Sequence, residues 1–549
     1  MLCRRSHHAG PELCLVKKSF LRQDTNKSPM KRWNGWGYST IDMPVPPTAA
    51  PLLGSLAGVP RPRLDATLNE VIEKLPPGRL PQDSLLTADP ETRLRHSRGQ
   101  SLSDWLELRY GSVNTFPDAV AFPETTDQVE HLLALAKREN AVVIPYGGGT
   151  SVVGHLTPPA GDRPVLTISL SRLNRLLDLN QADHLATFQA GVAGPDLEAT
   201  LRNFGYVLGH YPQSFEFSTL GGWVVTRSSG QQSLGYGRIE DLFAGGTLLS
   251  PAGKLVMPNH PASSAGPDLR QIVMGSEGKA GILSEVTVRV TPQPAHEKFA
   301  AILFPSWQQA VETAQALARS ELCLSMMRVS DARETVVQLG LAGTNPALKL
   351  LPAWPERCLM LLAFTANSRL TVERDRLRGW HAARQRGGLP LPGPFGEKWR
   401  DKRFRGAYLR NTLWDLGYAV DTLETCLLWS RLDQGKSLIE NALFEGLNGE
   451  GHVFSHLSHF YPSGCSLYTT YLFPLSDTEH AVREKWRRCK SRASEAIVRA
   501  QGTISHQHGV GLDHKPYLQY EKGQLGLDAL SASLHTFDPN SLMNPDKLL

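Results

Sequence analysis

The spacing of apolar residues along the chain predicts alternating strands and helices in its first half. Val129, Leu132 and Ala136 fall on one helical face, and Thr125 with Gln128 predicts a capping box at the start of that helix. Short apolar and β-branched runs predict buried strands at residues 120–123, 141–144, 164–170, 185–192, 242–249 and 284–290. We therefore expect sheets covered by helices in this part of the chain.

Helical spacing also marks the segments around these strands. Residues 64–109 are predicted to be helical, and a further helix begins at Pro195 and carries Leu197, Leu201 and Phe204. From residue 294 the pattern changes to a second α+β part. Strands are predicted at 300–304 and 358–364, a flexible Gly/Pro-rich insertion at 387–394 and a charged amphipathic helix at 479–500.

Composition narrows the class of protein. The chain has 549 residues, of which 41% are hydrophobic and 20% charged, so it is globular and too long for one core. A net charge of +5 gives no case for a nucleic-acid partner. The seven cysteines form no CxxC pair, which favours a reducing, cytoplasmic location. No apolar run reaches the ~18 residues of a transmembrane helix, and residues 1–30 are expected to be a disordered extension.

Three glycine-rich loops, each beside a predicted strand, are the main candidates for ligand binding. They are Pro145–Ser151 (PYGGGTS), Pro212–Gly230 (PQSFEFSTLGGWVVTRSSG) and Met274–Leu283 (MGSEGKAGIL). Glycine lets backbone N–H groups approach a ligand without side-chain obstruction, and the hydroxyl residues add compact donors. A single loop of this kind is more often a plain surface loop. Together, the three indicate one large ligand held at several points.

The order of these loops, followed by YGRIEDL at Tyr236–Leu242 and GPDLRQIVMGSEGKAGILSEVTV at Gly266–Val288, resembles the vanillyl-alcohol-oxidase type flavoproteins. Within them the chain most resembles the alkylglycerone-phosphate synthases. The resemblance implies an α+β protein with a two-part FAD-binding domain of the PCMH type and an α+β cap domain. The implied organisation is an extension at 1–30, a linker and helical segment at 31–111, the FAD-binding domain at 112–293, the cap at 294–500 and a segment returning to the FAD-binding domain at 501–549.

The resemblance implies that FAD, bound non-covalently, contacts the three loops. The family usually has Asp where this chain has Gln213, and His155 and His210 are the only residues that suggest covalent attachment. The implied cofactor residues are Pro145, Tyr146, Gly147, Gly148, Gly149, Thr150, Ser151, Gln213, Ser214, Phe215, Glu216, Phe217, Ser218, Thr219, Thr226, Arg227, Ser228, Ser229, Glu277, Gly278, Lys279, Ala280, Gly281, Ile282 and Leu283.

Five residues outside the loops are implied to act on the substrate. Tyr468 matches the family tyrosine that removes a proton, and Arg410 and Arg328 match arginines that reach the substrate. His506 and His508 flank Gln507, where the family has three histidines in a row. We expect these cations to favour the Tyr468 phenolate, because a free phenol titrates near ~10. Taken alone, the tyrosine is more often structural, the arginines more often solvated, and the histidine pair lacks a third metal ligand.

The leading hypothesis is an FAD-dependent enzyme that exchanges the acyl group of acyl-dihydroxyacetone phosphate for a fatty alcohol in ether-lipid synthesis. The alternative is an FAD-linked oxidase or dehydrogenase of a 2-hydroxy acid, of the D-lactate or glycolate type, and a third is a flavin-binding protein without turnover. The expected partners are an anionic, lipid-like small molecule, a second copy of the chain and, at most, the surface of a membrane. No metal is expected.

Overall fold

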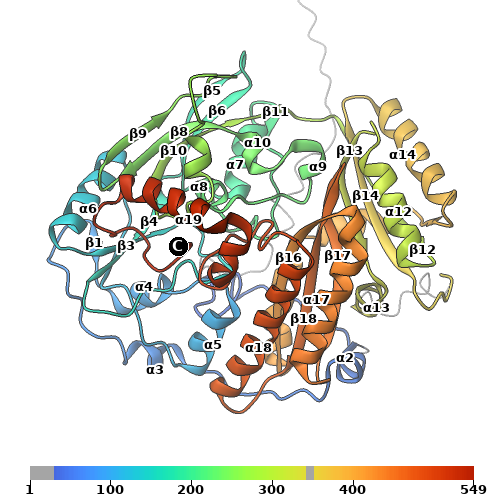
Figure 1. Ribbon diagram of the computed structural model, residues 1–549, viewed down its shortest axis with the longest axis horizontal. Coiled ribbons are helices and arrows are strands. Elements are labelled where there is room, and N and C mark those ends of the chain that lie inside the picture. Colours follow the sequence, from blue (N-terminus) through green and yellow to red (C-terminus); the bar gives the residue numbers. More distant parts are fainter. Residues whose placement is uncertain (1–29, 48, 342–350) are drawn as a thin grey trace, which may run out of the picture.

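The molecule has two halves with separate cores (Figure 1). The computed structural model describes residues 30–47, 49–341 and 351–549 of the chain. The predicted extension at 1–30 therefore lies outside the described residues, except for Met30. No helix in the described ranges is long and apolar enough to cross a membrane.

A four-stranded sheet forms the first part of the half that is predicted to bind FAD, which is called the FAD-binding half from here on. Its order is β1-β2-β4-β3, comprising β1 (Leu86–Thr87), β2 (Ala119–Ala121), β4 (Val165–Ser169) and β3 (Val142–Tyr146). The predicted helix is α6 (Thr126–Arg138), which buries its apolar stripe against this sheet. Thr125 caps it by accepting from the Gln128 N–H, as predicted. The Gln128 side chain, however, accepts from the Glu124 N–H at 2.6 Å, so the predicted capping box is replaced by a bond one residue earlier.

A five-stranded antiparallel sheet forms the second part. Its order is β5-β6-β10-β8-β9, comprising β5 (Leu176–Asn180), β6 (Leu185–Gln189), β10 (Ile282–Arg289), β8 (Phe243–Ser250) and β9 (Gly253–Met257). The patterns of β5 and β9 were too polar to predict strands, because these strands lie at the edges and are half exposed. The other elements here are α7 (Gly194–Arg202), β7 (Tyr206–Val207), α8 (Leu220–Thr226), α9 (Ser233–Tyr236), α10 (Ile239–Leu242), α11 (Arg270–Val273) and β11 (Thr291–Pro292).

Two local predictions in this half were wrong. Gly221 and Gly222 lie in the predicted loop Pro212–Gly230 but belong to helix α8. The helix packs closely through its glycines, since a Cβ on Gly221 would lie 2.8 Å from the Cβ of Ala190. Phe204 lies beyond the end of α7 and is 50% exposed, so only Leu197 and Leu201 carry its buried face.

The N-terminal segment is less helical than its pattern predicts. Prolines interrupt the stretch 64–109, and it forms α3 (Leu68–Ile72), α4 (Pro90–Arg95) and α5 (Leu102–Tyr110) with extended chain between them. Leu64, the first residue of the stretch predicted to be helical, is 92% exposed. A further helix, α2 (Ala49–Ala57), lies where we expected only a linker and packs on the cap.

The cap is built on a seven-stranded antiparallel sheet. Its order is β15-β12-β14-β13-β17-β18-β16, comprising β15 (Leu389–Pro390), β12 (His296–Phe304), β14 (Cys358–Ala366), β13 (Leu324–Ser330), β17 (His452–Tyr461), β18 (Gly464–Pro474) and β16 (Tyr418–Leu428). Its helices are α12 (Trp307–Ala318), α13 (Ala332–Leu341), α14 (Arg369–Arg384), α15 (Pro394–Lys402), α16 (Leu409–Asp415), α17 (Leu432–Leu447) and α18 (Glu479–Arg499). The predicted flexible insertion thus contains β15, which pairs with β12.

The end of the chain returns to the FAD-binding half. After α19 (Leu518–Phe537), Met543 forms a parallel bridge with Val143 of β3. Asn544 donates to the Glu277 carbonyl at 2.8 Å and Lys547 to the Thr157 carbonyl at 2.7 Å. Figure 1 shows the last helix, in red, lying across the FAD-binding half.

Candidate active site

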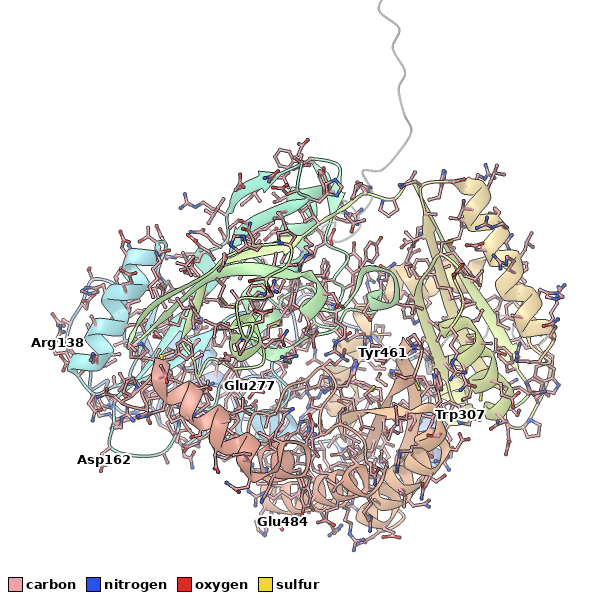
Figure 2. All side chains as sticks on the ribbon, turned by 45° about the horizontal axis from the view of Figure 1, so that its top comes forward. Arg138, Asp162, Glu277, Trp307, Tyr461 and Glu484 are labelled. Atoms are coloured by element: carbon pink, nitrogen blue, oxygen red, sulfur yellow. The ribbon has the colours of Figure 1, made fainter. Side chains whose placement is uncertain are left out.

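A cavity of about 530 Å³ lies where the two halves meet. The glycine-rich loops line one side of it, and β16, β17 and β18 of the cap line the other. Tyr461, at the end of β17, marks this junction in the middle of the molecule (Figure 2). Both groups of residues that the sequence singled out therefore face one space.

The loop after β3 presents bare backbone to this cavity. Within the described chain, the N–H groups of residues 147–151 have no hydrogen-bond partner. A Cβ on Gly148 would lie 1.9 Å from the Phe217 carbonyl oxygen, and Gly149 has φ +73°, so side chains are excluded at both positions. These residues are half-buried and line the cavity, so their N–H groups are available to a ligand. A run of such donors is suited to an anionic group such as a pyrophosphate.

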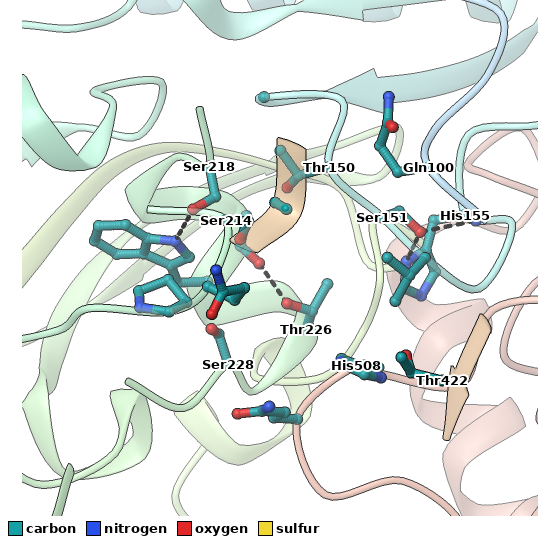
Figure 3. Close-up of a pocket in the computed structure, with 18 of the residues that line it drawn as sticks. Gln100, Thr150, Ser151, His155, Ser214, Ser218, Thr226, Ser228, Thr422 and His508 are labelled. Atoms are coloured by element: carbon teal, nitrogen blue, oxygen red, sulfur yellow. Dashed lines mark hydrogen bonds between the residues drawn. The ribbon is translucent and has the colours of Figure 1, made fainter. Parts of the chain in front are cut away.

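The central loop and α8 add hydroxyl groups around this cradle (Figure 3). Trp223 donates from Nε1 to the Ser218 hydroxyl at 2.7 Å, which fixes that side chain. The predicted cofactor residues that line the cavity are Pro145, Tyr146, Gly147, Gly148, Gly149, Thr150, Ser151, Gln213, Ser214, Ser218, Thr219, Thr226, Ser228, Ser229, Glu277, Gly278, Gly281, Ile282 and Leu283.

Six predicted cofactor residues lie off the lining: Phe215, Glu216, Phe217, Arg227, Lys279 and Ala280. Arg227 ends α8 in the left-handed conformation, with φ +52°, and its guanidinium turns to the Met274 carbonyl and Gln271. Phe217 packs edge-on against Trp36 and Tyr38 instead. These side chains hold the loops in place, and any contact with a ligand would come from their backbone.

Glu277 links the third loop to the end of the chain. This buried residue has φ +55°, and its carboxylate accepts from the N–H groups of Val510 and Gly511 and lies 2.9 Å from Nε2 of His155. Burial acts to raise the pKa of Glu277, but His155 and the two N–H groups outweigh it and lower the pKa. His155 is thereby engaged, and the other histidine considered for flavin attachment, His210, is fully buried against Trp223.

Tyr468 lines the cavity from β18 as a neutral phenol. Its hydroxyl donates to Thr422 at 3.0 Å, and its ring stacks on His456 with centroids 4.9 Å apart. Burial raises the pKa of Tyr468 to about 12, and the carboxylates of Glu424 and Asp421 act in the same direction. Arg328 acts in the opposite direction, as expected of a neighbouring cation, but it does not outweigh burial, so the phenol is neutral near pH 7.

Both predicted arginines line the cavity, each with part of its guanidinium unpaired. Arg410 donates to the Gln100 carbonyl at 2.5 Å and lies 4.2 Å from the centre of the Trp105 ring, while its Nη2 is buried without a partner. Burial lowers the pKa of Arg410 to about 10. Arg328 pairs with Glu334 at 2.6 Å and leaves Nε unpaired. Such groups are suited to an incoming phosphate or carboxylate.

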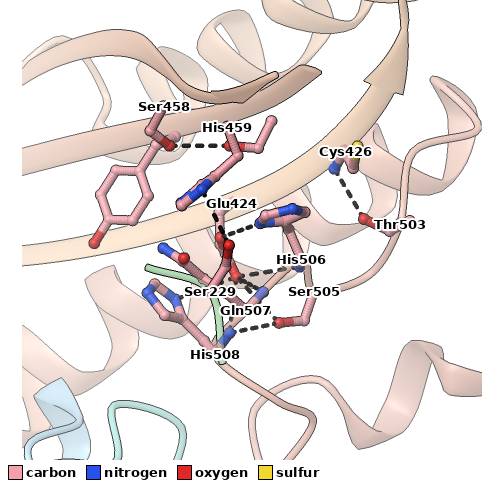
Figure 4. A network of polar contacts seen from close by, with 12 residues as sticks. Ser229, Glu424, Cys426, Ser458, His459, Thr503, Ser505, His506, Gln507 and His508 are labelled. Carbon is pink, nitrogen blue, oxygen red and sulfur yellow. Dashed lines mark hydrogen bonds and ion pairs between the residues drawn. The ribbon is translucent and has the colours of Figure 1, made fainter. Parts of the chain in front are cut away.

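The histidine segment curls around a buried carboxylate (Figure 4). Glu424 of β16 accepts from the N–H groups of His506, Gln507 and His508 at 3.1, 2.6 and 2.9 Å. The segment is therefore not the extended stretch that would put both histidines on one face. Burial lowers the pKa of both histidines, although Glu424 opposes it, so both rings are neutral near pH 7. No cluster of metal-binding side chains occurs in the described ranges.

The two histidines differ in what they face. His508 and Gln507 line the cavity, and His508 meets the Tyr468 ring edge-on at 5.5 Å between centroids. His506 does not line it: Arg238 and Tyr461 occupy its Nε2 at 2.5 and 2.7 Å. His506, predicted as a catalytic residue, therefore does not reach the cavity, because its ring is already used to hold the segment.

A group of apolar residues lines the cap side of the cavity and is here called the apolar branch. Most of its residues belong to one hydrophobic cluster around α2, α16 and the ends of β16 to β18. The lining residues of this branch are Leu53, Val337, Leu413, Val420, Phe454 and Leu472.

Several residues of the site were missed by sequence reasoning. Thr422, His456 and His459 lie on strands whose alternation gives no sign of a cavity, and Gln100 and Asn544 come from distant parts of the chain. No spacing in the sequence connects residues so far apart. The three histidines at positions 452, 456 and 459 were the one feature of the sequence that could have indicated a polar site on this strand.

The cavity fits FAD. It offers consecutive unpaired N–H groups for a pyrophosphate, a rim of hydroxyl groups, and space at the junction of the two halves for a flat ring. The chain also matches the model of the FAD binding domain over residues 117–257 and that of the FAD linked oxidases, C-terminal domain, over residues 293–548.

Curated and structural relatives agree with these models. The chain is 29% identical to an alkyldihydroxyacetonephosphate synthase of Dictyostelium discoideum over 97% of its own length and 95% of the relative's. A solved structure of an alkyldihydroxyacetonephosphate synthase has a TM-score of 0.81 at 27% identity, covering 94% of this chain and 99% of that one. A mitochondrial D-lactate dehydrogenase of Arabidopsis thaliana is 25% identical over 84% of this chain and 78% of its own. The chain therefore belongs to the FAD-binding flavoproteins with an FAD-linked-oxidase C-terminal domain, it resembles the alkyldihydroxyacetonephosphate synthases among them, and its cofactor is FAD.

Proposed function

We propose that the protein exchanges the acyl group of acyl-dihydroxyacetone phosphate for a fatty alcohol. One observation carries this proposal: Arg328, Arg410 and Tyr468 line the same cavity as the apolar branch. A site with two partly unpaired arginines and a long apolar extension is suited to a substrate with a phosphate at one end and an alkyl chain at the other. The synthase relatives support this assignment.

The residues of the chain would divide the work by their chemistry. The unpaired Nη2 of Arg410 and Nε of Arg328 would bind the phosphate and orient the ketone. The phenolate form of Tyr468, a minor species near pH 7, would accept a proton from C1, with Thr422 and His456 holding the side chain in place. The apolar branch would take first the acyl chain and then the alkyl chain. FAD, when bound, would supply an electron-accepting ring.

The exchange balances without an external oxidant. The C1–O bond to the fatty acid breaks and the acid leaves as a carboxylate, while the alcohol oxygen forms a new C1–O bond and loses its proton. A proton removed from C1 is returned at the end, so Tyr468 finishes in its starting state. No electrons are lost or gained overall.

The test is an anaerobic reaction of the purified yellow protein with palmitoyl-dihydroxyacetone phosphate and hexadecanol. We expect release of palmitate and formation of the alkyl ether without any electron acceptor. Tyr468→Phe should lower the rate by about 10²- to 10⁴-fold, the usual loss for a general base. Unchanged activity in that variant, or no release of palmitate by the wild type, would contradict the proposal.

A second candidate is the oxidation of a 2-hydroxy acid. The arginines would bind a carboxylate as readily as a phosphate, and a D-lactate dehydrogenase is among the relatives. In that case, a panel of 2-hydroxy acids would bleach the flavin absorbance near ~450 nm, and an added acceptor would restore it. The apolar branch has no role in this reaction, which is why we rank it second.

We also propose that the protein is a cytoplasmic homodimer that meets lipid surfaces only peripherally. The cysteines of the described chain, Cys323, Cys358, Cys426, Cys465 and Cys489, are free thiols, which suits a reducing compartment. Cell fractionation and light scattering test these points: a monomer, or a protein found mainly in a sealed organelle, would overturn them.

A further inference from the structure

A histidine outside the predicted set occupies a defined place on the cavity wall. His459 lies on β17 and lines the cavity beside the loop that carries Ser228 and Ser229. Its ring packs on that of His506, with centroids 4.9 Å apart (Figure 4). His459 is thus one of four histidines that the described residues place on the cavity wall, with His155, His456 and His508, and it comes from the cap sheet.

A β-bulge turns this side chain toward the cavity. Leu457 pairs with Leu467, whereas Phe460 pairs with Cys465, so β17 contains one more residue than β18 between these pairs. As a result, the neighbours Ser458 and His459 both line the cavity, which regular alternation would not allow. Bulges are often found beside active sites, where they re-aim a side chain.

Two hydroxyl groups of the FAD-binding half fix the orientation of the ring. Ser229 and Ser233 lie 3.1 and 3.0 Å from Nδ1 of His459. Burial, together with the nearby His506, lowers the pKa of His459 well below its usual value, so the ring is neutral. We assign the hydroxyl groups as the donors to Nδ1, which places the proton of the neutral ring on Nε2. No residue of the described chain bonds to Nε2, which stays accessible from the cavity.

We propose that His459 is a flavin-contacting residue, whose Nε2–H donates a hydrogen bond to an acceptor on the FAD ring. The flavin ring carries carbonyl and nitrogen acceptors and gains negative charge on reduction, so a donor at its edge stabilises it. Arg227, the cation that the sequence placed on this loop, turns away from the cavity. His459 is held by Ser229 of that loop, and so presents a donor on the cofactor's side of the space. The inference does not depend on which substrate the enzyme uses.

The test compares the His459→Phe and His459→Gln variants of the whole protein. We expect H459F to raise the FAD dissociation constant by roughly threefold to tenfold, the loss of about one hydrogen bond. We also expect the flavin midpoint potential to move to more negative values, because the reduced ring loses a donor. H459Q, which keeps an N–H, should recover part of both changes. Fluorescence titration with FAD and anaerobic potentiometry measure these two quantities without substrate.

Two further variants keep the result interpretable. Ser233→Ala removes one partner of Nδ1 from outside the cavity lining and should shift the potential in the same direction by less, even if H459F does not fold. His452→Phe makes the same change on the same strand away from the cavity, and should leave the potential unchanged. Wild-type values of both quantities in H459F, or in S233A if H459F does not fold, would overturn the proposal. So would an equal shift in H452F.

Discussion

At the scale of single residues, burial and two carboxylates keep the Tyr468 side chain neutral. Burial is the main cause of the raised pKa of its phenol, and Glu424 and Asp421, which lie on β16, act in the same direction. Glu424 also holds the segment that carries His508. The same carboxylate therefore builds the site and opposes the ionisation that proton abstraction requires, so an anionic Tyr468 is a minor species near pH 7.

The reaction rate should accordingly rise with pH if Tyr468 is the base. Its pKa is about 12, so the phenolate fraction grows about tenfold for each pH unit between pH 7 and 10. We expect kcat/KM for palmitate release to follow this slope without reaching a plateau. A plateau that begins below pH 8 would show that a different group with a lower pKa removes the proton.

Removing the charge of Glu424 should destabilise the fold at neutral pH. The pKa of Glu424 is lowered by His508, His506 and three N–H donors, which outweigh burial. Its contribution to stability is therefore present above the unfolded pKa of ~4.3 and is lost as pH falls below that value. Glu424→Gln should lose about 2–4 kcal/mol at pH 7 in urea unfolding, and less at pH 4. An equal loss at both pH values would contradict this account.

At the scale of elements, the sequence predicts those whose signals are local. The stripe of α6, its Thr125 cap and the apolar run of β3 appear as expected, because each depends on neighbouring residues. The edge strands β5 and β9 and the bulge in β17 were not predicted. Their positions depend on pairing with distant strands, which no local pattern records.

The apolar branch gives the cap elements a measurable role. Val420 of β16 is half-buried and lines this branch. Val420→Phe should narrow it and raise the KM for hexadecanol by about tenfold or more, while hexanol is affected less than about twofold. Steady-state kinetics with alcohols of increasing length measure the difference. Val256→Phe on β9, where the side chain is 61% exposed, is the matched control. If Val420→Phe raised the KM for hexadecanol and the KM for hexanol equally, the apolar branch would not be the binding site of the alkyl chain.

At the scale of the whole molecule, the site is assembled from parts far apart in the sequence. The three loops could be predicted because glycines and hydroxyl residues mark them one by one. The arrangement around Glu277 could not, since it joins His155 of one loop to Val510 and Gly511 near the end of the chain. The sequence also could not show that Arg238 bonds to His506, because the two residues are 268 positions apart, and His506 was therefore predicted to act on the substrate.

Breaking the contact at Glu277 should loosen the end of the chain. Glu277→Ala leaves His155 and two buried N–H groups without their carboxylate, and should cost about 3–5 kcal/mol of unfolding free energy. Chemical denaturation measures the loss, and limited proteolysis should cut first within residues 501–549. Glu124→Ala, where the side chain is 60% exposed, should change the stability by less than about 0.5 kcal/mol. A variant as stable and as protease-resistant as the wild type would rule out this linkage.

The return of the C-terminal segment also sets an order of events during synthesis. The N–H groups of residues 147–151 leave the ribosome long before Gln507, His508 and Asn544, which close the same cavity. A chain that lacks these residues cannot enclose a ligand in the cradle. We expect FAD to be held fully only after Asn544 has been translated, and a chain that stops before Gln507 to release its flavin.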